Sequence, residues 1–260
     1  MITATLDLLG SLHLTLWQWL LAGLCGLLIG AAKSGLTGMG FLAFPILAGI
    51  FGARVSTGVA LPMLLLADFF AVHHYNRHAD WKHLLRLMPW ALVGLFTALA
   101  VGGWVSNQGF GLLFAVTILT GIALVFLRDL HRKALAVPDQ TWFAGMMGAS
   151  AGFATMIGNA AGPMMSLYLL SMRLPKQVFI GTGAWFYLTV NVIKMPLQAF
   201  VWHTISLQTL AFNLATAPFI VLGIVGGIAT VRHIPERAYR LLVMASVTVA
   251  AVLLVVKLIL

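Results

Sequence analysis

Ten apolar runs, separated by short polar connections, make up almost the whole chain. Four of them form two pairs, at about 14–32 with 41–52 and at about 142–157 with 160–172, and most members of these pairs are short. The pattern predicts an all-α polytopic membrane protein. Each short pair forms two half-helices, a hairpin that enters the membrane and returns, or two complete tilted spans. The other six runs approach or exceed the roughly 20 residues of a spanning helix and start near residues 55, 84, 109, 178, 207 and 238.

The two short pairs carry an internal repeat about 120 residues apart. In each copy, at 30–45 and at 148–163, a Gly-rich break interrupts apolar sequence and a proline follows. Paired interruptions in corresponding halves of a membrane chain point to a transport site at the bilayer midplane. We therefore divide a single transporter domain, 1–260, into a first repeat at about 14–127 and a second at about 142–260.

Composition supports the membrane interpretation. The chain is 61% hydrophobic and only 8% charged, whereas soluble domains are about 25% charged. The net charge of +9 would suggest nucleic acid as a partner of a soluble protein. Here, however, the basic residues cluster in short connections between apolar runs, as in cytoplasmic membrane loops, and nucleic-acid binding is disfavoured. A single cysteine, Cys25, excludes an intrachain disulfide.

The distribution of Lys and Arg predicts the topology, because short basic loops stay on the cytoplasmic side. Connections near 106–108 and 202–206 carry neither residue and are placed outside. Each repeat then contributes three spans and one returning pair, so the two repeats are inverted relative to one another. Arg54 is the exception, at the outer face. The basic connections placed inside hold Arg77, Lys82 and Arg86; Arg128, Arg132 and Lys133; Arg173 and Lys176; and Arg232, Arg237 and Arg240.

The breaks are the predicted binding site. Unwound backbone in a membrane needs hydrogen-bond partners, and the helix that starts after each break offers free N–H groups and a positive dipole end. An anionic oxygen satisfies both. We expect the two breaks to meet near the bilayer centre, although small-residue packing between helices is the alternative reading of the glycines. The predicted substrate-binding residues are Lys33, Ser34, Gly35, Thr37, Gly38, Gly40, Thr155, Gly158, Asn159, Gly162, Asn191 and Lys194.

Three ionisable residues lie within or beside apolar runs. An ammonium in a spanning segment costs at least about 2.5 kcal/mol on insertion scales, so it normally faces a cavity or a partner. Lys33 and Lys194 contact substrate, or else Lys33 snorkels to the surface and Lys194 marks a helix end near the outer interface. Asp68 is the coupling candidate, for a proton or another cation, or it pairs structurally with a lysine or histidine. Asn191 occupies about the equivalent place in the second repeat.

The segment 73–81, His-His-Tyr-Asn-Arg-His-Ala-Asp-Trp, is the most polar stretch of the chain. Zinc requires three or four convergent ligands, and Asp80 is the only carboxylate nearby, so a metal site is disfavoured. A cytoplasmic interfacial turn fits better, with Trp81 at the headgroup level, and its histidines could sense pH. No cofactor or metal is expected.

The chain resembles the TauE/SafE family of sulfite and organosulfonate exporters, also called 4-toluene sulfonate uptake permeases. The resemblance rests on the two Gly-rich breaks with their prolines, on Asp80-Trp81 after a basic connection, and on the step 181–183 after Leu174-Pro175. It implies a transporter of small sulfur-containing anions with two homologous halves, in a bacterial inner membrane, and it supports site residues at Gly35 to Gly40 and Gly158 to Gly162. The first break reads Gly-Met-Gly at 38–40, where the family commonly has three glycines.

We therefore expect a secondary transporter that exports sulfite, sulfoacetate or another organosulfonate by alternating access. The sequence has no Walker-type phosphate-binding motif. An anion channel and a cation-coupled uptake carrier stay open. An intramembrane hydrolase is less favoured, because Asp68 stands alone in the apolar runs and no His-Glu-x-x-His motif is present. The expected partners are a small anionic substrate and membrane lipid, and a homodimer stays open.

Overall fold

The computed structural model of the chain describes residues 10, 12–36, 39–110, 112–113, 116, 141–235 and 238–239. Regular structure within these residues is entirely helical, which confirms the predicted all-α class. The predicted spans that start near residues 109 and 238 lie largely outside the described residues. The main helices are α2 (Leu16–Lys33), α3 (Gly40–Phe51), α4 (Ala53–Tyr75), η1 (Asn76–His78), α5 (Trp81–Trp104), α7 (Thr141–Gly158), α8 (Gly162–Ser171), α9 (Lys176–Pro196), the π-helical η2 (Leu197–Val201) and α10 (Leu207–His233).

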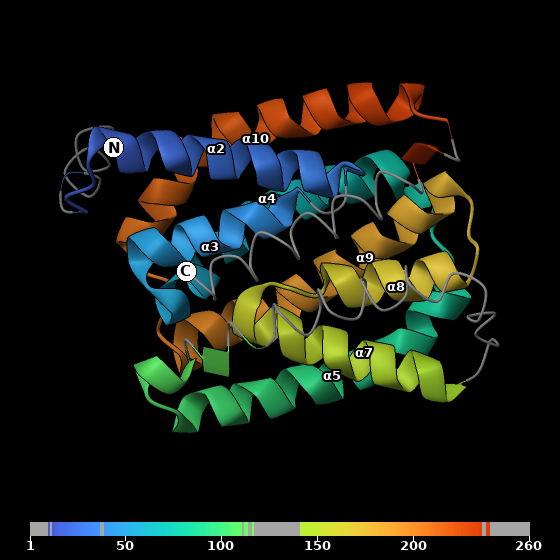
Figure 1. The fold of residues 1–260 in the computed structure, drawn as a ribbon, viewed down its shortest axis with the longest axis horizontal. Helices are drawn as coiled ribbons and strands as arrows, with labels where there is room; N and C mark the ends of the chain where they lie inside the picture. The colour runs from blue at the N-terminus through green and yellow to red at the C-terminus, as the bar shows by residue number, and fades with distance from the viewer. Residues whose placement is uncertain are drawn as a thin grey trace.

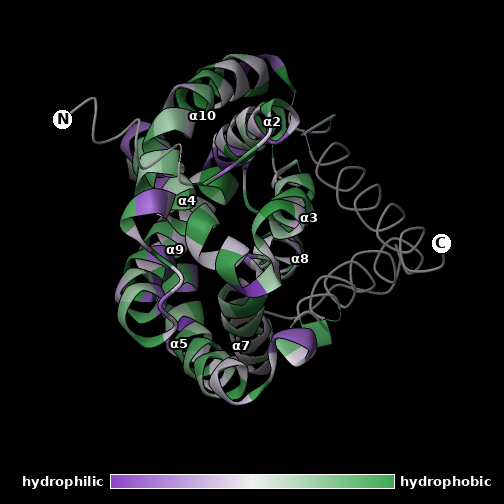
Figure 2. Cartoon of the chain, turned by 90° about the vertical axis from the view of Figure 1, so that its left-hand side faces the viewer, coloured by the Kyte–Doolittle hydropathy of each residue, from purple (hydrophilic) through white to green (hydrophobic). Residues whose placement is uncertain are grey.

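The outer surface of the bundle is apolar. In the described part of the chain, five helices are long and apolar enough to cross a membrane: α2, α4, α5, α9 continued by η2, and α10. Trp17, Trp104 and Phe200 are 67%, 88% and 77% exposed, and hydrophobic residues cover much of the outside of the bundle in Figure 2. Soluble proteins rarely expose apolar surface on this scale. The chain is therefore a multi-pass membrane protein.

The helices lie side by side along the long axis of the molecule (Figure 1). At one edge α2 packs beside α10, and at the other α5 packs beside α7, with α3, α4, α8 and α9 between them. Glycines make the two edge contacts close: a Cβ on Gly30 would overlap the Ile220 carbonyl oxygen, and one on Gly152 would overlap that of Ala91. Small residues of this kind are what membrane helices use to approach one another. Gly30 and Gly152 of the repeated segments are therefore packing residues.

Each edge pair consists of helices that run in the same direction. Along α2 and α10, Gly23 lies against Phe219 and Ala31 against Gly227. The contacts between α5 and α7 follow the same parallel order. In the middle of the bundle α4 and α9 are antiparallel, because Gly181 at the start of α9 lies against the end of α4.

Positive charge gathers at one end of the bundle, called the basic end below. The opposite end carries one basic residue among those described, Arg54. Its guanidinium donates to the carbonyl oxygens of Gly102 (2.9 Å) and Val105 (2.8 Å), at the last turn of α5. A cation is favourable there because it meets the negative end of the helix dipole, which accounts for this exception to the charge pattern. The basic end carries Arg77, Lys82, Arg86, Arg173, Lys176 and Arg232.

The two short pairs form antiparallel hairpins, α2 with α3 and α7 with α8. Gly35 takes a φ of 121° after α2, and Asn159 takes a φ of 54° after α7; both residue types tolerate this left-handed backbone. The two breaks meet in part: Gly40 of the first and Asn159 and Gly162 of the second line one cavity, while other break residues are offset along α4. The Ser34 carbonyl accepts from the Tyr75 hydroxyl at the basic end (3.2 Å), whereas Asn159 contacts Thr57 near the opposite end of α4.

Helix length explains this offset. Both α2 and α7 have 18 residues, so each extends about 27 Å at 1.5 Å per residue, close to the whole thickness of a bilayer core. Each break therefore lies near the far side of the bundle from the end where its hairpin starts. The parts of the breaks that come together inside are their last residues, Gly40 and Gly162, at the start of α3 and α8.

The close packing of α5 on α7 gives a test of the fold. Gly152→Ala should lower the free energy of unfolding by about 1–3 kcal/mol, because the added methyl group meets the backbone at Ala91. Gly226→Ala is the matched control on α10, where no atom lies within 4 Å of the added Cβ. Thermal unfolding of the purified proteins in detergent measures both. Equal melting temperatures for the two variants would contradict the α5–α7 contact.

Candidate functional site

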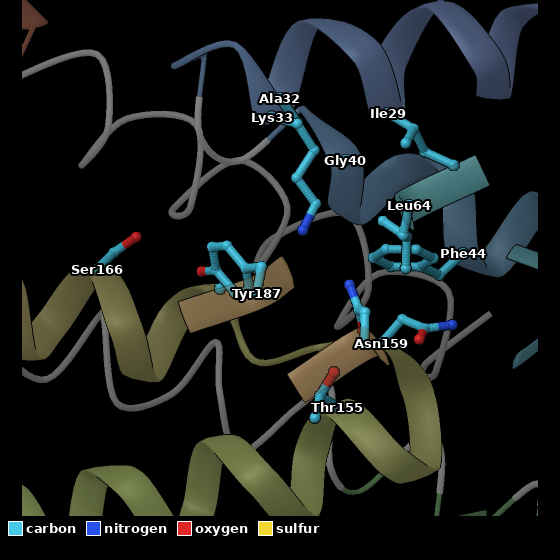
Figure 3. A pocket seen from close by; sticks show the side chains of 12 residues that line it. Ile29, Ala32, Lys33, Gly40, Phe44, Leu64, Thr155, Asn159, Ser166 and Tyr187 are labelled. Carbon is cyan, nitrogen blue, oxygen red and sulfur yellow. The ribbon is translucent and has the colours of Figure 1, made fainter. Parts of the chain in front are cut away.

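A cavity of about 70 Å³ lies between the two hairpins (Figure 3). A single water needs about 10–15 Å³ on this scale, so the cavity has room for several waters or one small polyatomic ion. In Figure 3 Lys33 enters from one side, and Thr155 and Asn159 come from the other. This space is called the central cavity. Its wall consists of Ile29, Ala32, Lys33, Gly40, Phe44, Leu64, Thr155, Asn159, Gly162, Ser166, Tyr187 and Asn191.

Two helix N-termini open onto the central cavity. Gly40 is the first residue of α3 and Gly162 the first of α8, and both line its wall. Neither helix has a side-chain cap, because Met39 and Ala161 at the N-cap positions make no such hydrogen bond. Uncapped N–H groups and the positive dipole ends therefore face the same small space. An anionic ligand stabilises both.

Lys33 supplies a positive charge at the same place. It is the last residue of α2, and its ammonium lies 2.7 Å from Asp68 Oδ1 and 3.9 Å from the centre of the Tyr187 ring. Asp68 is fully buried, and its Oδ2 accepts a hydrogen bond from Asn191 Nδ2 (2.7 Å). Asp68 thus pairs with a lysine, and Lys33 does not extend to the surface of the bundle but lines the cavity.

Lys194 lies behind the opposite wall, with no exposed surface. Its ammonium donates to Thr155 O (2.7 Å), Thr155 Oγ1 (3.3 Å) and Asn159 Oδ1 (2.6 Å). Three acceptors match the three N–H donors of a protonated lysine. Asn159 Nδ2 in turn donates to the Thr57 carbonyl (3.2 Å). Lys194 therefore orients two cavity residues and does not lie at the outer interface.

The charges around the central cavity do not cancel. Among the described residues, two lysines and one carboxylate lie at or behind the cavity wall, so one positive charge is in excess when both lysines are protonated. A buried charge without a counter-ion is expensive in a membrane. An anion in the cavity would complete the balance.

The structure separates the predicted site residues into groups. Lys194 and Asp68 lie behind the wall and contact residues that line it. The Ser34 hydroxyl donates to carbonyls of its own helix, and Gly158 is buried in the last turn of α7. Gly35 lines a second, smaller cavity. Thr37 and Gly38 lie outside the described residues. Those that line the central cavity are Lys33, Gly40, Thr155, Asn159, Gly162 and Asn191.

Sequence reasoning missed Ser166 and Tyr187, which line the cavity, and Gln198, which continues the polar network. Gln198 Nε2 donates to Thr57 Oγ1 (3.2 Å). A detectable signal was present in α9, whose polar residues at 187, 191, 194 and 198 recur at helical spacing on one face. For Ser166, within an apolar run, no comparable pattern exists.

Residues 22–254, nearly the whole chain and both hairpins, match a family model described as sulfite exporter TauE/SafE. The chain belongs to the TauE/SafE family. No curated protein and no solved structure matches the chain. TauE/SafE proteins are transporters, which favours transport over catalysis and agrees with the multi-pass helical fold. Within this TauE/SafE protein the central cavity is the candidate site for the transported solute.

The ion pair between Lys33 and Asp68 can be tested through stability. Asp68→Leu leaves a buried lysine without its counter-ion and should destabilise the protein by about 3–5 kcal/mol. The double variant Lys33→Met/Asp68→Leu replaces the whole pair with apolar groups and should recover most of that loss. Thermal unfolding in detergent distinguishes the two. A double variant no more stable than Asp68→Leu would argue against the pair.

Proposed function

We propose that this TauE/SafE protein is a secondary carrier that exports a small sulfur-containing anion across a bacterial inner membrane by alternating access. The observation that carries the proposal is the meeting of two uncapped helix N-termini and the Lys33 ammonium in one cavity. Each of these groups favours negative charge. Family membership supplies the sulfur chemistry, since TauE/SafE members are described as sulfite exporters.

Cavity size favours an inorganic oxyanion such as sulfite as the substrate. A volume of about 70 Å³ corresponds to roughly five water-sized positions. One sulfur with three oxygens fits this space. The ring of an aromatic sulfonate requires more room, and sulfoacetate is an intermediate case.

An inverted repeat would explain how the site is reached from both sides in turn. If α2 to α5 correspond in order to α7 to α10, the parallel contact of α2 with α10 corresponds to that of α7 with α5. Under the same correspondence α4 and α9 are equivalent helices, so they would lie in contact across the axis that relates the two repeats. Asp68 of α4 and Asn191 of α9 form a hydrogen bond in this contact. Relative movement of two such halves around a fixed site is a common mechanism of alternating access.

The direction of transport follows from charge. The positive-inside rule assigns the basic end to the cytoplasm, where its arginines and lysines raise the local concentration of anions. An inside-negative potential then favours exit by about 2.3 kcal/mol per negative charge for each 100 mV. Export requires no ATP under these conditions.

Cation-coupled uptake is the second candidate, and one contact favours it. Lys33 both lines the cavity and pairs with Asp68. An anion that attracts Lys33 would therefore weaken the ion pair between Lys33 and Asp68. Asp68 would then accept a proton together with the anion. Anion flux driven by an imposed pH gradient, absent in Asp68→Asn, would support this alternative over simple export.

A flux assay tests the proposed function directly. In proteoliposomes the wild-type protein should give saturable sulfite transport with counterflow, and Lys33→Gln should reduce the rate by about tenfold or more, as expected for loss of a charged contact. Arg77→Gln is the control for charge, since Arg77 is exposed at the basic end. Unchanged transport in Lys33→Gln would remove the site from the mechanism. Unitary currents in planar bilayers would identify a channel instead.

Substrate size gives an independent prediction. At 100 times its dissociation constant, a ligand of the folded state should add about 2.7 kcal/mol of stability. We expect sulfite to raise the melting temperature of the purified protein and 4-toluenesulfonate to leave it unchanged. Stabilisation by the aromatic sulfonate alone would contradict the size argument.

A further inference from the structure

A second cavity, of about 30 Å³, lies beside the central cavity and shares Tyr187 with it. It reaches Gly35 at the end of α2 and Phe179 and Gly183 near the start of α9, all toward the basic end. The two cavities have four wall residues in common. These are Ala32, Lys33, Ser166 and Tyr187.

Two of the shared residues carry hydroxyl groups with no protein partner. Within the part of the chain that the structure describes, neither Ser166 Oγ nor Tyr187 Oη makes a hydrogen bond, although Ser166 is only 5% exposed. A serine in an apolar helix usually donates to a carbonyl of the preceding turn. Ser171, on the same helix, does so, to Leu167 O at 2.7 Å. In Figure 3 the Ser166 hydroxyl instead leaves α8 on the side of Tyr187.

Hydroxyls that face a cavity without a protein partner normally have a ligand or water to bind. Both hydroxyls are donors, and the ammonium of Lys33 lies 3.9 Å from the centre of the Tyr187 ring. Two donors and one cation around a small space suit an oxygen-bearing anion.

We propose that Ser166, Tyr187 and Lys33 form a second binding position for a small oxyanion, between the central cavity and the basic end. This inference rests on the proposed function and adds a step to it. Lys33 lines both cavities, so the anion passes from one position to the other without leaving the ammonium. Tyr187 also borders both positions. The second position has a smaller volume than the central cavity, so the solute has less room there.

The alternative is that Tyr187 serves only as a support for the Lys33 ammonium through its ring. Tyr187→Phe separates the two roles, because it keeps the ring and removes the hydroxyl. Ser166→Ala removes the other hydroxyl with little change in volume. Ser171→Ala is the matched control, since Ser171 lies on the same helix and its hydroxyl bonds within that helix.

The experiment is sulfite uptake into membrane vesicles of both orientations, with the KM measured from each face. Ser166→Ala and Tyr187→Phe should each raise the KM about tenfold from the basic-end face, as expected for one lost hydrogen bond to a charged ligand. From the opposite face, and in Ser171→Ala, the KM should stay within twofold of wild type. Thermal unfolding of each variant confirms that it is folded.

The outcomes separate the two proposals. A wild-type protein that carries no sulfite or related anion overturns the proposed function, and this inference with it. Normal transport by the wild type with an unchanged KM in both variants, or with an equal rise from both faces, overturns only the second binding position.

Discussion

The central constraint on this structure is the burial of two lysine ammonium groups in an apolar helical bundle. One of them, Lys33, is neutralised by Asp68. The other, Lys194, is held by uncharged oxygens of Thr155 and Asn159. Because the bilayer core supplies no water, each ammonium fixes the position of the helices that carry its acceptors. These contacts link α2 to α4 and α9 to α7.

Together with these contacts, glycine packing and helix length leave a cavity between the two hairpins. Close approach at Gly30 and Gly152 brings α2 onto α10 and α7 onto α5, so the long arm of each hairpin lies at an edge of the bundle. The short arms, α3 and α8, lie between these edges. Both helices begin within the apolar core, and neither N-terminus has a side-chain cap. A space bordered by such ends is polar even though most of its wall is hydrocarbon.

The sequence predicted the class of the fold and several residues that line the candidate cavity, for reasons that can be traced to particular residues. Apolar runs and basic connections can be recognised from composition and length alone. An ionisable residue in a membrane run, such as Lys33 or Asp68, can be recognised because its insertion costs free energy. The partners could not be predicted, because Asp68 meets Asn191 across 123 residues of chain. The offset of the two breaks depends on how far α2 and α7 extend before they end, and sequence patterns locate helix ends poorly. Ser166 carries no sequence signal, since its importance comes from a hydroxyl that turns away from its own helix.

The interruption after α7 has backbone carbonyls on one side and backbone amides on the other, which carry opposite partial charges. The carbonyl of Thr155, one of the last in that helix, accepts from a lysine, whereas the next helix begins four residues beyond Gly158 with its amides toward the solute space. The direction of the main chain, and not only the side chains, therefore favours negative charge in the cavity. Under the proposed function, substitutions around the wall can alter which anion is preferred, while the positive ends of α3 and α8 remain in any variant that keeps the hairpins.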